Sequence, residues 1–374
     1  MITFICPKCS GEPHVPFGAS HVSTPAHPKL HMIKAKLPLF LGLFLGFSAA
    51  LSAATDLPRT GLTKTKDRLS VTSNTDWGGA VVSYKWDGYE FVDVLDAGRE
   101  MQVAAFIENW PKFQADTRPG KTWKIRGSSL YYSTIFNNKD PFIGIPFRPV
   151  NPNEAGSNVS NGHHKSVTTN SYNSGDTHIT RSKPMDWDGY RWGFDDNAIQ
   201  RFPRGREIQH SNCLIGKDLT LGFKSEHAAQ YVSVYDPTTT GVWRWEAPTI
   251  YMLNHLNKAY SFDAQSENLT DRTNTGISFK PASGYGGCIY ATDNGSRAIG
   301  IYGATTAVGG SISHFSIFKP GTFGNVQKCG AVTPWANRNA NTTYTARSYI
   351  IAGSLNSVKT VMRQLYNQRS SVPK

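Results

Sequence analysis

The chain has 374 residues, of which 39 are Lys or Arg and 27 are Asp or Glu, so its formal net charge is +12 at pH 7. A charge of this sign favours an anionic partner through long-range attraction, although solubility alone would also explain it. The basic residues are scattered along the chain and form no stripe, which argues against a nucleic-acid partner.

The first recognisable segment is 32–54. It begins with Met, carries two lysines, continues as an apolar run and ends in small residues, which is the layout of a secretory signal peptide. The apolar run is shorter than the ~20 residues of a membrane span, so no membrane span is predicted. We expect a secreted or periplasmic protein, cleaved after Ala53 or Ala54, with 55–374 as one β-sandwich catalytic domain and 1–31 as an extension upstream of the true start.

Alternation of apolar and polar residues begins at Ala80. Ala80–Trp86 and Tyr89–Val94 alternate on either side of Asp87-Gly88, a dipeptide typical of tight hairpin turns. Turn-forming Gly, Asn, Pro and Asp separate the later strand candidates. These candidates are residues 129–136, 218–224, 230–235, 241–245, 288–292, 298–302, 312–318 and 344–352.

The hairpin leads into a dense polar cluster around Gly98. An unpaired charge buried in a core strand is strongly unfavourable, so these groups must face water or be held around something polar. Gly98 permits a bulge that redirects the side chains. We predict that Asp96 pairs with Arg99, and that these two and Gln102 bind a sugar substrate. An ion pair that only orders a turn is the alternative.

Residues 151–186 are rich in Asn, Ser, Gly, His and Thr and show little periodicity, which predicts a long loop that is mobile or functional. Glu154 lies among turn formers, so we expect it at the surface or in a cleft, as a general acid or base or as an ordinary loop carboxylate. His163 and His164 are candidate bases at neutral pH. A metal site is not predicted, because no carboxylate stands at a known spacing from them.

Residues 186–194 hold the densest group of aromatic side chains. Tyr190 and Trp192 offer flat faces to a sugar ring, and Arg191 would neutralise a uronate or a sulfate. These three residues are predicted to bind substrate, and a hairpin corner packed into the core is the alternative.

Glu246 follows two tryptophans, and an apolar setting raises the pKa of a carboxyl group and suits it to general acid catalysis. Glu246 and Glu154 would then form the two-carboxylate pair of a glycosidase. Tyr251 and His255 are the alternative catalytic pair, for β-elimination on a uronate. In that reaction a base removes the C5 proton while Arg or Gln neutralises the carboxylate.

One helical pattern appears, near the C-terminus. Leu355, Val358, Met362 and Leu365 recur at helical spacing after Ser354, a suitable N-cap. Many short strands with one terminal helix predict an all-β fold, a large antiparallel β-sandwich with a C-terminal α-helix.

The chain has five cysteines. Cys6 and Cys9 have the spacing of half a zinc site, but no clear second half follows, and no metal site is predicted. Two of the three later cysteines could pair in an oxidising compartment, and we expect Cys288 to pair with Cys329 and to leave Cys213 over.

The stretch TDWGGAVVSYKWDGYEFVDVLDAGREMQ resembles the opening of galactose-mutarotase-like supersandwich domains, in which a strand with a Gly-Gly or Gly-Ala pair precedes a hairpin and an Asp-x-Gly element. The pieces EAPTIYML, GCIYATDNGSRAIGIYG and SYIIAGSLNSVKTVMRQL are similar to segments of secreted proteins of this kind. The resemblance implies a carbohydrate-handling supersandwich: an epimerase, lyase, glycosidase or accessory domain. The catalytic His and Glu of mutarotases find no residue-by-residue match, so mutarotase activity is in doubt.

The expected function is that of a secreted enzyme that degrades an anionic polysaccharide, with glycoside hydrolysis favoured. A polysaccharide lyase and a non-catalytic carbohydrate-binding protein are the alternatives. No cofactor is predicted, and a structural calcium ion is left open. All of this depends on one spatial expectation: the Gly98 cluster, the histidine-bearing segment and Glu246 share one groove.

Overall fold

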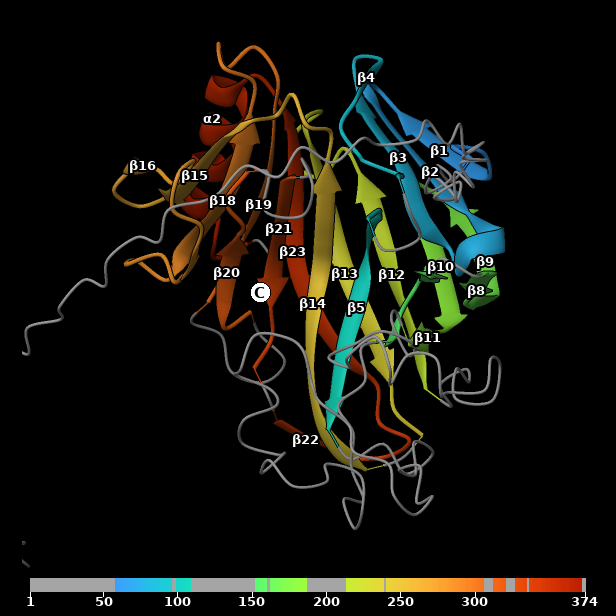
Figure 1. The fold of residues 1–374 in the computed structure, drawn as a ribbon. Coiled ribbons are helices and arrows are strands. Elements are labelled where there is room, and N and C mark those ends of the chain that lie inside the picture. Colours follow the sequence, from blue (N-terminus) through green and yellow to red (C-terminus); the bar gives the residue numbers. More distant parts are fainter. Residues whose placement is uncertain are drawn as a thin grey trace, which may run out of the picture. The chain divides into compact units, whose positions relative to one another are not determined.

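In the part of the chain that the structure describes, two large antiparallel β-sheets and a C-terminal helix make up most of the fold (Figure 1). The computed structural model describes residues 58–95, 99–108, 152–159, 162–186, 213–238, 240–305, 312–320, 327–334 and 336–371. All of them belong to one compact unit, Leu51–Lys374. The predicted all-β antiparallel sandwich with a C-terminal helix is confirmed.

The larger sheet has twelve strands among the described residues, with β1-β2-β3-β5-β14-β21-β20-β17 as its main path. Four short strands join this path at its sides: β4 on β3, β6 on β5, β11 on β6 and β22 on β14. The strands are β1 (Leu62–Lys66), β2 (Leu69–Asn74), β3 (Ala80–Trp86), β4 (Tyr89–Glu90), β5 (Met101–Glu108), β6 (Pro152–Asn153), β11 (Met185–Asp186), β14 (Gly241–Met252), β17 (Ile277–Phe279), β20 (His314–Ile317), β21 (Gln327–Val332) and β22 (Ala336–Arg338).

The second sheet has nine strands among the described residues, in the order β16-β15-β18-β19-β23-β13-β12-β10-β9. Its strands are β9 (Val167–Ser174), β10 (Thr177–Lys183), β12 (Leu214–Leu221), β13 (Ala228–Asp236), β15 (Lys258–Asp263), β16 (Leu269–Asp271), β18 (Tyr285–Ala291), β19 (Ala298–Ala304) and β23 (Tyr344–Gly353). A separate ribbon pairs β7 (Gly156–Val159) with β8 (Gly162–Lys165), and a short 3-10 helix, η1, covers Thr75–Trp77.

The predicted hairpin is present as β3 and β4. Its turn residues Asp87 and Gly88 have φ angles of 53° and 75°, the left-handed conformation that this turn requires and that Asp-Gly tolerates. The other predicted strands match β12, β13, β14, β18, β19, β20 and β23, with shifted ends, whereas the candidate 129–136 lies outside the described residues.

The prediction of a long loop over residues 151–186 is wrong for most of the segment. Its first part contains β6 and the β7–β8 ribbon, and in its second part β9 and β10 form a hairpin that extends the second sheet. Strand β10 buries every second side chain, but these are polar: His178, Thr180 and Ser182. Because the inward positions carry no apolar residues, the period of two was invisible in the hydrophobic pattern.

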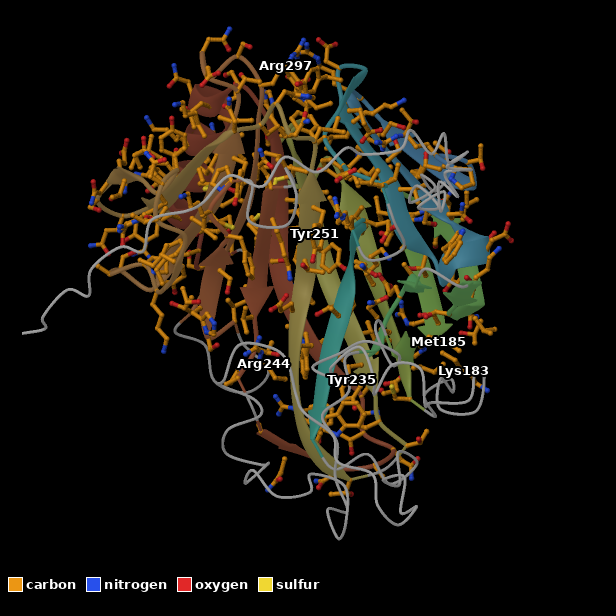
Figure 2. All side chains as sticks on the ribbon, viewed as in Figure 1. Lys183, Met185, Tyr235, Arg244, Tyr251 and Arg297 are labelled. Atoms are coloured by element: carbon orange, nitrogen blue, oxygen red, sulfur yellow. The ribbon has the colours of Figure 1, made fainter. Side chains whose placement is uncertain are left out.

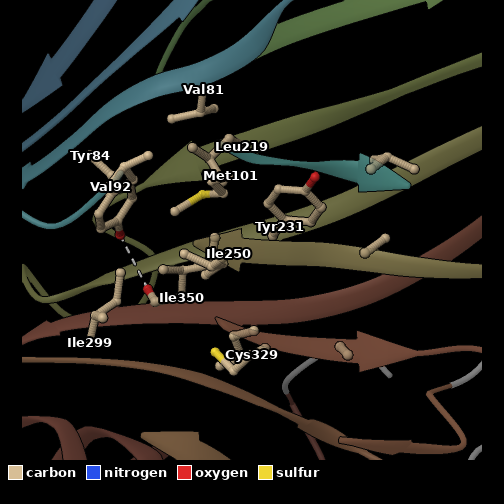
Figure 3. Packing of buried hydrophobic residues seen from close by; sticks show 14 of the residues in the cluster. Val81, Tyr84, Val92, Met101, Leu219, Tyr231, Ile250, Ile299, Cys329 and Ile350 are labelled. Carbon is tan, nitrogen blue, oxygen red and sulfur yellow. Dashed lines mark hydrogen bonds between the residues drawn. The ribbon is translucent and has the colours of Figure 1, made fainter. Parts of the chain in front are cut away.

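The main hydrophobic core lies between the two sheets. It combines residues of the larger sheet, such as Val81 and Ile250, with residues of the second sheet, such as Leu219 and Ile350 (Figure 3). The Tyr84 hydroxyl on β3 donates to the Ile350 carbonyl on β23 at 3.3 Å, a hydrogen bond that links the two sheets. Burial of this core is the main driving force for the sandwich.

The three described cysteines, Cys213, Cys288 and Cys329, belong to this core. All three are free in the described structure. The expected pairing of Cys288 with Cys329 is therefore wrong, and the three thiols are small core side chains.

The predicted helix is present as α2 (Leu355–Asn367), with Ser354 as its N-cap: the Ser354 hydroxyl accepts from the Ser357 amide at 3.1 Å. The helix packs on the outer face of the second sheet, against β18, β19 and β23. Gly300 permits this approach, because a Cβ there would lie 2.6 Å from the Met362 side chain.

Candidate functional site

The candidate site lies on the face of the larger sheet that points away from the second sheet. Trp243 and Trp245 of β14 pack on Tyr235 of the second sheet, with ring centroids 4.5 and 5.5 Å from that tyrosine. Side chains alternate along a strand, so Arg244 and Glu246 face the opposite way. The two tryptophans that precede Glu246 in the sequence therefore face the core, not the carboxylate.

A register shift after Glu246 sets which residues meet on this face. Glu246 lies opposite Val332 of β21, and the pairing resumes with Thr249 opposite Gly330. Tyr251 then lies opposite Lys328. A Cβ at Gly330 would lie 3.8 Å from Glu246 Oε2, so the carboxylate extends over the position that lacks a side chain.

Four charged or phenolic side chains meet at this point. Lys328 Nζ lies 3.1 Å from Glu246 Oε2, and the Arg244 guanidinium donates to Glu246 Oε1 at 3.2 Å. Lys328 Nζ also lies 5.2 Å from the centroid of the Tyr251 ring, and Tyr251 is one of the groups that raise the pKa of Lys328. We call Arg244, Glu246, Tyr251 and Lys328 the polar face (Figure 2 labels Arg244 and Tyr251).

The polar face is largely withdrawn from solvent. Glu246 is 4% exposed and the Lys328 side chain 12% exposed. Thr249 and Gln102, which pair across β14 and β5, are buried too. This face of the sheet lies away from the hydrophobic core between the sheets, yet its polar side chains are buried. Buried polar side chains outside a hydrophobic core are typical of functional sites.

The two cations decide the protonation of Glu246. Burial by itself raises the pKa of this carboxyl group, but Lys328 and Arg244 bring the pKa below its ordinary value. Burial likewise lowers the pKa of Lys328, while Glu246 and Tyr251 raise it overall. The predicted raised pKa of Glu246 is therefore wrong. The sequence prediction took the tryptophans as its surroundings, whereas the structure places two cations there.

His314 borders the polar face from β20. It lies opposite Val332, which lies opposite Glu246 in turn, so the three residues form one row across the sheet. Burial, and then Arg244, lower the pKa of His314, which is therefore neutral at pH 7. Its Nδ1 lies 2.7 Å from the Ser313 hydroxyl.

Glu154 lies on the other side of the larger sheet from Glu246. Its carboxylate accepts from the Val103 amide at 2.9 Å and from Lys217 Nζ at 2.7 Å, and Lys217 belongs to β12 of the second sheet. Both side chains of this ion pair are 0% exposed. The expected surface or cleft position of Glu154 is therefore wrong, because the chain turns inward after β6 and directs the carboxylate between the sheets.

Burial dominates this second pair. It raises the pKa of Glu154 despite Lys217, and it lowers the pKa of Lys217 despite Glu154. The Lys217 ammonium also donates to the Gly79 carbonyl at 2.8 Å and to the Thr180 hydroxyl at 3.1 Å. The two predicted catalytic carboxylates thus point to opposite sides of one sheet and do not face one another.

Part of the Gly98 cluster is described. Arg99 lies 3.9 Å from Asp93, and Asp96, its predicted partner, lies outside the described residues. The Gln102 amide donates to Glu100 at 3.3 Å and accepts from the Ala155 amide at 3.0 Å. Gln102 therefore lies next to the polar face, but these two bonds already engage its amide.

The structure does not describe the side chains of five other predicted site residues. The backbones of His163 and His164 form part of β8, and their side chains are not among those described. Tyr190, Arg191 and Trp192 fall outside the described residues altogether.

His255 lies in the turn after β14 and does not pair with Tyr251 in the described structure. Its Nε2 hydrogen-bonds the Tyr89 hydroxyl, and the centroids of the two rings are 5.6 Å apart. Arg297 also lies against the Tyr89 ring, at 4.9 Å. The predicted Tyr251–His255 pair is therefore replaced by two separate contacts: Tyr251 with Lys328, and His255 with Tyr89.

Sequence reasoning missed Lys328, Arg244 and His314. A local signal existed for Arg244, because it alternates with Trp243 and Trp245 and so shares a face with Glu246. No such signal existed for Lys328 or His314, since each is distant in the sequence and reaches the site only through sheet pairing.

Two features are absent from the described part of the chain: a cluster of potential metal ligands and a membrane-spanning helix. No group of three or more His, Cys, Asp or Glu side chains is placed there to hold a metal ion. None of the helices within those ranges has the length and apolar character needed to cross a bilayer.

No protein-family model and no curated protein matches this chain. Similar solved structures include an aldose epimerase homologue from C. elegans (8% identity, TM-score 0.42, covering 79% of this chain and 99% of that one) and a putative aldose 1-epimerase from Klebsiella pneumoniae (8%, 0.40, 81% and 81%). An α-galactosidase from Lactobacillus brevis is also similar (8%, 0.39), with 79% of this chain covered, although the chain spans only 39% of that protein. As the sequence resemblance predicted, galactose-mutarotase-like proteins are among the structural neighbours. The sequence identities and TM-scores are too low to carry information on activity.

Proposed function

We propose that the protein is an exported enzyme that cleaves a uronate-containing polysaccharide by β-elimination, with the polar face as its active site. One observation carries the proposal: the buried Lys328 ammonium lies both against the ring of Tyr251, at 5.2 Å from its centroid, and against the carboxylate of Glu246, at 3.1 Å. A proton-transferring phenol beside a cation is what this chemistry needs.

Tyr251 is the proposed proton-transfer residue. The Lys328 ammonium lies against the Tyr251 ring and can only donate hydrogen bonds, so the phenol oxygen would be the acceptor of a bond between them. An ammonium group in this position stabilises the phenolate that removes the C5 proton of the uronate. The C4–O bond then breaks, a C4=C5 double bond forms, and the phenol returns the proton to the departing oxygen.

The charge of the polar face suits an anionic sugar. Arg244 and Lys328 each carry a positive charge and contact Glu246. A uronate carboxylate bound beside these two cations would be neutralised, which makes the C5 proton easier to remove. The formal net charge of the chain, +12, attracts the same class of substrate over longer distances.

Glycoside hydrolysis by Glu154 and Glu246 has less support. A general acid must hold a proton near neutral pH, and the pKa of Glu246 is lowered by its two cations. Glu154, whose pKa is raised, faces the space between the sheets and bonds Lys217 there.

The test is incubation of the full chain with a panel of uronate-containing and neutral polysaccharides. We expect the ultraviolet absorbance of an unsaturated uronate to appear only with the uronate-containing substrates. Tyr251→Phe should lower this rate by ~10²-fold or more. Tyr172→Phe is the matched control, because Tyr172 is an exposed tyrosine of β9, and it should retain the full rate.

Other outcomes would replace the proposal. New reducing ends without the absorbance would mean hydrolysis, and affinity without any product would mean a carbohydrate-binding protein. A Tyr251→Phe variant with the full elimination rate would reject the role of Tyr251.

A further inference from the structure

His314, which borders the polar face, is a titratable residue for which the proposed function gives no role. Strands β20, β21 and β14 lie side by side in the larger sheet, and His314, Val332 and Glu246 occupy one row across them (Figure 1). Residues that lie opposite each other in antiparallel strands point to the same face of the sheet. The His314 imidazole is therefore on the same face as the Glu246 carboxylate. It is half-buried, so it is the more accessible of the two groups.

Ser313 fixes which nitrogen of this imidazole carries the proton. The Ser313 hydroxyl donates to the Val332 carbonyl at 2.9 Å and lies 2.7 Å from His314 Nδ1. A carbonyl oxygen can only accept, so the single hydroxyl proton is used in the first contact. The second contact is then a hydrogen bond only if Nδ1 donates. In the neutral ring the proton is thus on Nδ1, and Nε2 keeps its lone pair.

The surroundings of the ring keep it neutral at pH 7. Burial has the largest effect on the pKa of His314 and lowers it, and Arg244 and Lys280 lower it further, whereas Glu246 raises it. Arg244 lies beside Glu246 on β14, and Lys280 directly follows β17, the strand that pairs with β20. A second positive charge is unfavourable between these cations, so His314 presents an uncharged ring.

An unprotonated nitrogen complements the other groups of the polar face. Lys328 and Arg244 can only donate hydrogen bonds, and the Glu246 carboxylate contacts both of them. The described residues give the His314 ring a hydrogen bond at Nδ1 and none at Nε2. A uronate carries a carboxylate, which accepts hydrogen bonds, and hydroxyl groups, which can donate them. The two cations suit the carboxylate, and Nε2 suits a hydroxyl.

We propose that Nε2 of His314 accepts a hydrogen bond from a hydroxyl group of a uronate chain bound on the polar face. The inference rests on the proposed function for the class and the place of the ligand. His314 is a binding residue in this role, and it transfers no proton. A site built to bond a hydroxyl rejects ligands in which that hydroxyl is missing or blocked. His314 would therefore make the protein select unsubstituted chains over O-acetylated ones.

The first experiment determines the tautomer and needs no ligand. The full chain is labelled with isotope-enriched histidine, and long-range proton–nitrogen NMR spectra are recorded at neutral pH. The signals of His314 are those missing from the His314→Gln variant. We expect the ring proton on Nδ1, and Ser313→Ala should lose this preference because it removes the acceptor. A proton on Nε2 in the unmodified chain would overturn the proposal, since that nitrogen would then donate.

The second experiment measures affinity by isothermal titration calorimetry. The probes are uronate oligosaccharides, oligogalacturonate and oligoalginate among them, and the parent is Tyr251→Phe, so that the probes are not consumed. Adding His314→Leu should weaken binding about tenfold, which corresponds to one lost hydrogen bond. His314→Gln should keep most of the affinity, because its amide oxygen can accept in place of Nε2. His227→Gln is the control, since His227 directly precedes β13 in the second sheet, and it should bind as the parent does.

Acetylated probes test the selection itself. The parent should bind the O-acetylated form of a probe more weakly than the unacetylated form, and this difference should shrink in His314→Leu. A difference that is the same in both proteins would contradict the bond to a hydroxyl. Thermal denaturation of each variant separates lost binding from lost folding. The tautomer of the unmodified chain tests the proposal should His314→Leu fail to fold.

The outcomes distinguish this inference from the proposed function. Equal affinity of His314→Leu and its parent would overturn the inference, even if the unmodified chain carries out β-elimination. Binding that depends on His314 without any elimination would reject the proposed reaction and keep the inference. If none of the uronate oligosaccharides binds, the ligand class is wrong and both are rejected.

Discussion

Two carboxylate–lysine pairs on the same sheet behave in opposite ways. On the polar face, Glu246 contacts both Lys328 and Arg244, and its pKa is lowered. Between the sheets, Glu154 contacts Lys217 at 2.7 Å, and its pKa is raised. Both carboxylates are almost fully buried, so burial alone does not explain the difference.

The number of cationic partners accounts for it. For Glu154, the contact with Lys217 and the weaker influence of Arg181 do not offset the loss of hydration on burial, whereas for Glu246 the contacts with Lys328 and Arg244 do. The pair between the sheets is thus a costly structural contact. On the polar face, by contrast, the two cations stabilise the charged form of the carboxylate.

Removal of Lys217 tests the inner pair and should have the largest effect on stability. Lys217→Met leaves the Glu154 carboxylate buried without its cation, and we expect a loss of about 3–5 kcal/mol in the free energy of unfolding. Lys183→Met is the control, since Lys183 is exposed on the neighbouring strand β10, and it should stay near the unmodified protein. The measurement is urea denaturation at neutral pH.

A companion variant shows whether the charge is responsible. The double variant Lys217→Met with Glu154→Gln removes both charges, and we expect it to recover part of the lost stability. If the double variant were as unstable as Lys217→Met alone, packing around Lys217 and not the unpaired carboxylate would be the cause.

Removal of Lys328 tests the polar face and should cost less stability but more function. Glu246 keeps Arg244 as a partner in Lys328→Met, so we expect a loss of only about 1–3 kcal/mol. The rate of β-elimination should fall by ~10²-fold, because Tyr251 loses the cation beside it. Denaturation and absorbance assays on the same preparation check both effects, and a fully active Lys328→Met variant would exclude Lys328 from catalysis.

The pH dependence of stability should show the smallest effect and the clearest contrast. The raised pKa of Glu154 means that the folded protein keeps a proton there above about pH 4.3, where the unfolded chain has lost it. Its contribution to stability therefore decreases as pH rises through that window. For Glu246 the pKa is lowered, so its contribution is present above about pH 4.3 and disappears as pH falls through the lowered value.

Two neutral variants make this contrast measurable. Glu246→Gln should reduce the loss of stability on acidification, and Glu154→Gln should increase it. In each case the change is about 1.4 kcal/mol for each tenfold difference between the acid dissociation constants of that carboxyl group in the folded and the unfolded chain. Denaturation midpoints measured from neutral to acidic pH give the two slopes. Slopes that change in the same direction in both variants would contradict the different protonation of the two sites.

Whether a sequence prediction was right depended on how far apart in the sequence the interacting residues lie. The β3–β4 hairpin and helix α2 were predicted because turn residues and helical spacing act over a few positions. The β9–β10 hairpin was missed because its inward side chains, His178 among them, are polar. At the candidate site, Glu246 and Tyr251 were found by their residue types, but the setting assigned to Glu246 was wrong.

Local patterns in the sequence are enough to predict that this chain builds strands, where several of them turn, and that a helix follows the last one. Alternation, Asp-Gly turns and helical spacing involve residues a few positions apart and do not depend on how the strands pair. The contacts of Glu246 with Lys328 and of Glu154 with Lys217 arise from the tertiary fold. Those contacts depend on strand pairing between distant segments and on one register shift in β14, and no local pattern encodes either.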